Sequence, residues 1–214
     1  MTLNKQAMRT LYRRRAARYD LAVRIYPFFG FRMERYRRLA VDALRLRPGD
    51  TVIELGCGTG LNFPLLRHAV GAEGRVIGVD LTDAMLDQAR NRVRRSDWQN
   101  VDLVQADAST YDFPAGVAGV FSTFAITLVP EYDEVIRAAS HALKQGGRLA
   151  VFDFKQPGHW PESLVRFATW LNKPFGVSLD LAERHPWESI GRYLTPVHFQ
   201  EFYRGALYLA VGER

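Results

Sequence analysis

The segment that most constrains this 214-residue chain is Glu54-Leu55-Gly56-Cys57-Gly58-Thr59-Gly60, which follows the apolar residues Val52 and Ile53. A hydrophobic run ends in a carboxylate, and three glycines then alternate through a tight turn. Glycine has no Cβ, so it lets the backbone come close to a ligand. A helix that starts after such a turn points free backbone N–H groups at that ligand. The segment therefore predicts a strand, a ligand-binding turn and a helix, with a turn that binds nothing as the alternative.

A second acidic residue, Asp80, ends the next hydrophobic run, residues 75–79, twenty residues after Gly60. This spacing is typical of a second strand whose acidic tip receives ribose hydroxyl groups. The dinucleotide fingerprint G-x-G-x-x-G would need glycine at position 61, where the chain has Leu61. The observed G-x-G-x-G spacing, with Glu54 two residues ahead of it, favours a cationic or amino-bearing ligand over a pyrophosphate.

Composition narrows the class of protein. The length suits one α/β domain with a full core, and 47% hydrophobic residues indicate a globular chain. No apolar run reaches the roughly 18 residues of a membrane span, and the N-terminus, charged from Lys5 onward, has no apolar signal-peptide core. The single cysteine, Cys57, excludes an internal disulfide and a cysteine-based zinc cluster. We therefore expect a cytoplasmic protein without a metal.

The order of the elements predicts the fold class. Strands are expected at residues 51–55, 76–79, 101–105, 119–123 and 148–154. Helices are expected at residues 4–18, 32–46, 62–70, 131–144, 159–175 and 186–194, and a further helix is expected to start near residue 82. Two further strand runs, 199–203 and 206–211, predict a C-terminal hairpin. This alternation indicates an α/β, doubly wound, mostly parallel sheet. We expect a single domain, with a basic helical lid at 1–47, a core at 48–157, and substrate-side helices and the hairpin at 158–214.

The segment from Glu54 to Gly60 and Asp80 resemble the first motif and the ribose-binding acid of class I S-adenosylmethionine-dependent methyltransferases. Asp107, after the third expected strand, matches the acid of that family that receives the adenine amino group, and Ala108 matches the next position. A strand-ending Asp that caps a turn is the alternative. The resemblance covers about residues 45–155 and implies a seven-stranded Rossmann-like sheet and S-adenosyl-L-methionine as cofactor. The implied cofactor-binding residues are Glu54, Gly56, Cys57, Gly58, Thr59, Gly60, Asp80, Leu81, Met85, Asp107, Ala108 and Thr123.

Polar residues after the fourth strand, Ser122, Thr123 and Thr127, should face the sulfonium side of the pocket. Amino-methyltransferases of DNA and many of RNA carry Asn/Asp-Pro-Pro-aromatic here, whereas this chain has Thr123-Phe124-Ala125-Ile126. Methylation of cytosine at carbon 5 needs a cysteine nucleophile, and Cys57 lies in the glycine turn instead. The sequence therefore disfavours a nucleic-acid substrate.

The N-terminal region is strongly basic. Residues 5–47 contain one lysine and twelve arginines against Asp20, Glu34 and Asp42. Such an arm can bind nucleic acid, an anionic membrane surface or an acidic substrate, or it can be a solvated helix face.

Tyr12 and the pair Tyr19-Asp20 carry a further resemblance. Quinone-biosynthesis methyltransferases and bacterial phosphatidylethanolamine N-methyltransferases often have a tyrosine–aspartate pair in an N-terminal helical region that closes over the cofactor. Tyr19 is the candidate catalytic residue that orients the acceptor, with simple packing as the alternative. His185, before Pro186, is the second candidate, as proton acceptor, with a turn or cap role as its alternative.

The first acceptor expected is the amine of phosphatidylethanolamine and its methylated derivatives, because a basic amphipathic helix can bind an anionic leaflet. The alternatives are a prenylated quinone precursor methylated on a ring carbon, and a soluble small molecule. A cofactor-binding protein without transferase activity is disfavoured, because Glu54, Asp80 and Asp107 are all present. The expected location is the cytoplasm, with peripheral attachment to the inner face of the membrane and phospholipid as partner as further hypotheses. The oligomeric state stays open.

Overall fold

One mixed sheet organises the chain. The computed structural model describes residues 5–23, 33–157, 160, 161, 163, 165, 166, 181 and 183–214. Within these residues seven strands pair in the order β3-β2-β1-β4-β5-β7-β6. They are β1 (Thr51–Leu55), β2 (Arg75–Asp80), β3 (Val101–Gln105), β4 (Val117–Thr123), β5 (Leu143–Phe154), β6 (Thr195–Phe202) and β7 (Leu207–Glu213). Strands β1 to β5 pair in parallel, and β7 pairs antiparallel with both β5 and β6. The predicted mostly parallel sheet with a C-terminal antiparallel hairpin is confirmed.

Helices cover both faces of the sheet. The described helices are α1 (Lys5–Val23), α2 (Met33–Ala43), α3 (Phe63–Val70), α4 (Asp83–Arg95), α5 (Tyr132–Ala142) and α7 (Pro186–Tyr193), with 3₁₀ turns η2 (Ile126–Leu128) and η5 (Tyr203–Gly205). Helices α2, α3 and α4 bury Ala40, Leu66 and Leu86 against one face. Helices α5 and α7 bury Ile136 and Ile190 against the other. Each helix thus hides an apolar stripe while its polar side faces solvent.

Three helix ends differ from the sequence prediction by two residues or more. Helix α2 ends at Ala43 instead of residue 46, and the other two differences concern α1 and α5. Helix α1 continues through Tyr19 and Asp20 to Val23, rather than ending near residue 18. Helix α5 ends at Ala142, and β5 already begins at Leu143 instead of Arg148. The difference at α5 arises because buried Leu143 pairs with Val117 of β4.

The C-terminal third completes the sheet. Strand β6 begins at Thr195, four residues before the predicted start, because Thr195 already pairs with Glu213 of β7. The helix predicted at 186–194 is present as α7. The predicted helix at 159–175 lies largely outside the described residues.

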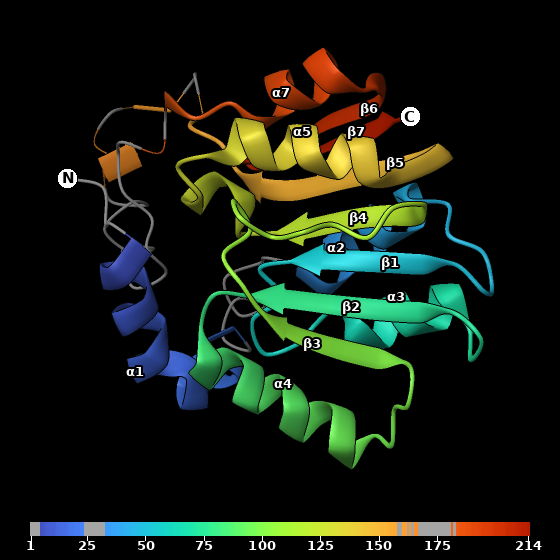
Figure 1. Cartoon of the computed structure of the whole chain (residues 1–214). Coiled ribbons are helices and arrows are strands. Elements are labelled where there is room, and N and C mark those ends of the chain that lie inside the picture. Colours follow the sequence, from blue (N-terminus) through green and yellow to red (C-terminus); the bar gives the residue numbers. More distant parts are fainter. Residues whose placement is uncertain are drawn as a thin grey trace.

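The carboxyl ends of the parallel strands meet at one edge of the sheet, and Figure 1 shows α1, in blue, lying across that edge beside α4. Crossover connections in such sheets leave a crevice at this edge, where ligands bind. Within the described residues, no helix combines the length and the apolar character needed to cross a membrane.

Candidate functional site

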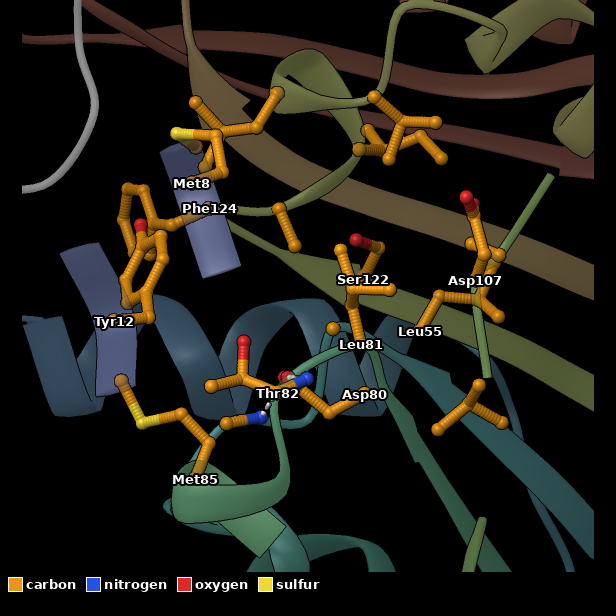
Figure 2. Close-up of a pocket in the computed structure, with 18 of the residues that line it drawn as sticks. Met8, Tyr12, Leu55, Asp80, Leu81, Thr82, Met85, Asp107, Ser122 and Phe124 are labelled. Atoms are coloured by element: carbon orange, nitrogen blue, oxygen red, sulfur yellow. Dashed lines mark hydrogen bonds between the residues drawn. The ribbon is translucent and has the colours of Figure 1, made fainter. Parts of the chain in front are cut away.

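A pocket of about 980 Å³, counted to its open mouth, lies between α1 and the carboxyl ends of β1, β2, β3 and β4. Figure 2 shows Tyr12 of α1, Asp80 and Thr82 after β2, and Phe124 after β4 around this space. The pocket therefore occupies the crevice that the glycine turn and the strand tips predicted.

The glycine turn follows β1 as expected. Gly56, Gly58 and Gly60 have φ of 65°, 54° and 76°, a region open to glycine and unfavourable for other residues. A Cβ on Gly56 would lie 2.2 Å from the Cβ of Ala125. A Cβ on Gly58 would meet no atom within 4 Å, and Gly58 lines the pocket. The turn is thus packed at Gly56 and leaves an open cradle at Gly58 beside the pocket.

Asp80 fixes this turn from the neighbouring strand. Its Oδ2 accepts a hydrogen bond from the Gly58 N–H at 2.8 Å, and its Oδ1 accepts one from the Thr82 N–H at 2.8 Å (Figure 2). Burial raises the pKa of Asp80, while these two backbone donors oppose the rise. The carboxylate lines the pocket, and each oxygen keeps a further lone pair for a hydroxyl donor. This arrangement fits a ribose.

Glu54 lies behind the turn with an unsatisfied oxygen. Its Oε1 accepts a hydrogen bond from Asn62 Nδ2 at 2.5 Å, whereas its Oε2 is buried and has no partner among the described residues. Burial raises the pKa of Glu54 to about 8, although Asn62 and Arg37 oppose the rise. A buried polar atom without a partner is costly, so an ammonium group would relieve this oxygen. The unpaired Oε2 of Glu54 and the open space beside Gly58 are two features that would suit an amino-acid-bearing nucleoside such as S-adenosylmethionine.

A network that the sequence analysis missed supports Glu54. Buried Asn62 receives a hydrogen bond from Arg37 Nη1 at 2.8 Å and donates one to Thr123 Oγ1 at 2.9 Å. Asn62 could have been found from its position, directly after the glycines at the start of a helix. Arg37 lies on α2 among many surface arginines, and no local pattern marks it as buried.

Asp107 carries an ion pair with the N-terminal helix. Its Oδ2 lies 2.8 Å from Lys5 Nζ, and its Oδ1 accepts hydrogen bonds from the N–H and the hydroxyl of Ser109 at 2.9 and 2.8 Å. Burial alone would raise the pKa of Asp107, but Lys5 and Ser109 hold it below its ordinary value. Lys5 also pairs with Glu131 at 2.9 Å. The predicted adenine-binding acid therefore also anchors one end of α1.

The other end of α1 is anchored on the glycine turn. Asp20 accepts a hydrogen bond from Thr59 Oγ1 at 2.5 Å and pairs with Arg92 Nη2 of α4 at 2.5 Å. Between the two anchors, Met8, Tyr12 and Tyr19 of α1 line the pocket. Burial raises the pKa of Tyr19 and raises that of Tyr12 well above its ordinary value. Helix α1 thus forms a roof over this pocket.

The predicted site residues fall into two groups. Those that line the pocket are Gly56, Gly58, Asp80, Leu81, Met85, Asp107, Ala108, Thr123 and Tyr19, together with Ser122. Four others are not on its wall. Glu54 lies just behind it, and Cys57 packs in the core beneath the turn. Thr59 binds Asp20, and Gly60 turns the chain toward α3. Burial also raises the pKa of the Cys57 thiol well above its ordinary value, which agrees with its interpretation as a small packing residue.

His185 is not brought to the pocket. Its Nδ1 lies 3.1 Å from a carboxylate oxygen of Glu188, and its ring lies 4.8 Å from that of Trp187. The residue occupies the N-cap position of α7 but makes no side-chain capping hydrogen bond, so the proton-acceptor role stays a prediction. Thr127, which was expected on the sulfonium side of the pocket, is buried and does not line the pocket wall. Its backbone N–H donates a hydrogen bond to the carboxylate of Asp153. Within the described residues, no cluster of three His, Cys, Asp or Glu side chains could hold a metal ion.

Comparison with known proteins agrees with this geometry. Residues 52–147 match the methyltransferase domain family. The chain is 33% identical over 146 residues to the ubiquinone/menaquinone biosynthesis C-methyltransferase UbiE of Shewanella sediminis, covering 67% of this chain and 57% of that protein. It is 29% identical over 145 residues to the demethylmenaquinone methyltransferase of Listeria welshimeri, covering 66% and 61%. The match thus spans less than two thirds of the length of these curated relatives.

Solved structures show the same fold. The chain is similar to the geranyl diphosphate C-methyltransferase of Streptomyces coelicolor, which was solved with Mg²⁺, geranyl diphosphate and S-adenosyl-L-homocysteine. The TM-score is 0.68 and the sequence identity is 19%, and the match covers 85% of this chain and 80% of that one. It is also similar to a SAM-dependent methyltransferase from Aquifex aeolicus, with a TM-score of 0.59 and 19% sequence identity. That match covers 82% of this chain and 88% of the Aquifex protein. At these identities the likeness concerns the fold.

Proposed function

The chain belongs to the class I S-adenosylmethionine-dependent methyltransferases, and we propose that it transfers a methyl group to a ring carbon of a quinone precursor. Among the relatives named above, one is a ubiquinone/menaquinone biosynthesis C-methyltransferase and another is a demethylmenaquinone methyltransferase. This supports the quinone alternative of the sequence analysis over phosphatidylethanolamine, which was its first expectation and which none of these relatives favours.

The polar end of the pocket suits the cofactor. Glu54 would hold the ammonium group, Asp80 the ribose hydroxyls and Asp107 the adenine amino group. When bound, S-adenosylmethionine supplies a methyl group on a positively charged sulfur. The residues of the chain then orient the acceptor and exclude water. Because the leaving thioether is neutral and needs no charge stabilisation, these two effects are the main contributions of the protein to catalysis.

The observation that carries the proposal is the apolar wall of the pocket beyond the cofactor end. Met8 and Tyr12 of α1, Phe124 after β4, and Leu128 and Val129 beside η2 supply it. An apolar, aromatic wall stabilises a planar hydrocarbon ring by burial and by ring contacts.

Tyr19 is the residue that we propose orients the acceptor. It lines the pocket with its ring centroid 6.3 Å from that of Tyr12. Tyr19→Phe should lower kcat about tenfold or more while leaving the affinity for S-adenosylhomocysteine nearly unchanged, the pattern of an interaction made mainly in the transition state. An equal loss of cofactor affinity would instead assign Tyr19 to cofactor binding.

The acceptor is tested with methyl-labelled S-adenosylmethionine and three candidates offered in parallel: a reduced prenylated naphthoquinone, phosphatidylethanolamine in vesicles, and a total water-soluble metabolite extract. Label should enter the naphthoquinol as a new methyl group on carbon. Label in the phospholipid alone would restore the first expectation of the sequence, and label in the aqueous fraction alone would indicate a soluble acceptor.

Delivery of a prenylated acceptor requires access to lipid, and α1 offers a surface for it. Arg14 and Leu21 of α1 are exposed, and Leu21 keeps 63% of its area open to solvent. We propose that this side of α1 rests on an anionic leaflet, with about 1 kcal/mol from each basic side chain near the surface. Sedimentation should show binding to anionic vesicles that weakens with salt. Equal binding to neutral vesicles would contradict the electrostatic part.

A further inference from the structure

Phe124 has an unusual backbone conformation at the pocket. Its φ is 55°, in the left-handed region, and it is a bulky residue rather than a glycine. Such a conformation is unfavourable for a residue with a Cβ and persists only where the surroundings enforce it. The residue follows directly after β4 and lines the pocket.

Three contacts enforce this conformation. The Phe124 N–H donates to the carbonyl of Phe152 at 3.0 Å, which keeps the residue attached to β5. Three residues later, the Thr127 N–H donates to the buried carboxylate of Asp153 at 3.1 Å. Asp153 Oδ1 also accepts its neighbour's N–H, from Phe154, at 2.8 Å. The carboxylate at the end of β5 thus fixes the turn that follows Phe124.

The ring of Phe124 rests on two other aromatic rings. Its centroid lies 5.1 Å from that of Phe152 at 76°, and 4.8 Å from that of Phe154 at 50°. Phe152 is fully buried, and neither of these two rings lines the pocket. The strained backbone therefore carries a rigidly supported ring out of this cluster to the pocket wall, where Tyr12 and Met8 of the roof also lie (Figure 2).

We infer that Phe124 is the surface on which the planar ring of the methyl acceptor stacks, and so a residue that determines acceptor specificity. The inference rests on the proposed function for the chemical class of the ring. An aromatic pair contributes beyond simple burial only when geometry is fixed, and the strained, supported turn fixes it.

The test measures binding of 1,4-naphthoquinone to the full chain saturated with S-adenosylhomocysteine. A saturated bicyclic diol of similar size is the non-planar control ligand. Phe124→Leu removes the ring, and Phe124→Gly also removes the strain. Both should weaken naphthoquinone binding roughly two- to tenfold. Both should keep wild-type affinity for S-adenosylhomocysteine, and Phe124→Tyr should restore naphthoquinone binding. Phe154→Leu, which removes a supporting ring outside the pocket, is the matched control and should stay within twofold.

The outcomes separate this inference from the proposed function. If naphthoquinol is methylated but Phe124→Gly binds naphthoquinone as tightly as the wild type, the stacking surface is wrong and the proposed function stands. If binding depends on Phe124 but naphthoquinol is never methylated, the stacking surface stands and the acceptor assignment fails. If the wild type binds the saturated diol as well as naphthoquinone, or binds neither, the inference is overturned.

Discussion

The floor and the roof of the cofactor pocket are built by different forces. The floor is the glycine turn and the tip of β2, where Asp80 holds backbone N–H groups of Gly58 and Thr82. Its elements are fixed by the parallel ladder β3-β2-β1-β4. The roof is α1, where most of the described side chains keep part of their surface open to solvent, while Tyr12 and Tyr19 line the pocket. It is held by pairs between partly exposed side chains, Lys5 with Asp107 and Arg92 with Asp20.

This difference indicates which part can move. Backbone hydrogen bonds within a buried sheet open only with global or near-global unfolding. Half-exposed ion pairs contribute about 0–1 kcal/mol each and weaken with salt. A cofactor enclosed by both parts can therefore exchange by opening the roof while the floor stays intact. The side chains that hold the roof are bonded to Asp107 and Thr59. Opening of α1 therefore exposes the proposed adenine end of the pocket and the glycine turn.

The largest effect should come from removing the anchor of the floor. Asp80→Ala should cost about 1.5–3 kcal/mol of affinity for S-adenosylhomocysteine, since charge-assisted hydrogen bonds to ribose are lost. Asp102→Ala removes a surface carboxylate paired with Arg75 on the neighbouring strand, and it should leave affinity unchanged. Titration calorimetry measures both, and equal affinities in the two variants would remove Asp80 from the site.

The cradle at Gly58 gives the next largest effect. Gly58→Ala places a methyl group in the ligand space and should weaken cofactor binding by about 1–3 kcal/mol. Gly116→Ala is the matched control, because Gly116 also has a positive φ, 80°, and no atom within 4 Å of its would-be Cβ. Both variants should lose similar stability in urea unfolding, roughly 1–2 kcal/mol for the left-handed backbone. Loss of affinity in both would show that strain, not the cradle, is responsible.

The protonation state of Glu54 gives a way to test whether this residue of the floor interacts with the cofactor. Its pKa of about 8 in the free protein means that it is mostly protonated at pH 7. A bound ammonium group lowers that pKa, so cofactor binding should release close to one proton and strengthen up to about tenfold as pH rises toward 8. The raised pKa also predicts that this group makes the folded state less stable as pH rises from about 4.5 to 8.

The proton released on binding can be counted by titration calorimetry in buffers of different ionisation enthalpy, because its uptake by the buffer changes the observed binding enthalpy. Glu54→Gln, which cannot ionise, should bind S-adenosylhomocysteine without the buffer dependence. A wild-type binding enthalpy that is the same in all buffers at pH 7 would contradict the assignment.

The smallest effect is expected at the roof. Asp20→Ala removes the bonds to Thr59 and Arg92, and it should raise the rate of tryptic cleavage within residues 9–18 about two- to fivefold. Added salt should reduce the difference from the wild type. Arg38→Ala, which breaks an exposed pair with Glu34 within α2, is the control. Unchanged cleavage in Asp20→Ala would mean that apolar contacts, not charges, hold the roof.

Local patterns predicted the floor well. The glycine turn, Asp80 and the strands β1 and β3 were placed from sequence because their geometry depends on a few consecutive residues. The alternation of strands and helices likewise predicted the sheet. Helix α5 was predicted two residues too long, because the pairing of Leu143 with Val117 depends on a strand far away in the sequence.

Long-range contacts decided the remaining details of the site. The basic arm was interpreted as a charged surface, yet Arg37 is buried on Asn62 and Lys5 is bound to Asp107. Phe124 was noted only as a departure from another motif. His185 was placed near the acceptor because of its neighbours in sequence, but it lies at the start of α7, paired with Glu188.

The sequence by itself determined the class of fold and the position of the glycine turn and its acidic neighbour, because glycine φ preferences and acidic strand tips are local properties of Gly56, Gly58 and Asp80. Only the tertiary structure decided that α1 is a roof held by charge and that Asn62 links Arg37 to Glu54. Only it decided that Asp153 holds the strained turn carrying Phe124 to the pocket. Burial, hydrogen bonding across the sheet and the pKa of a buried carboxyl depend on residues up to about a hundred positions apart, which no local pattern specifies.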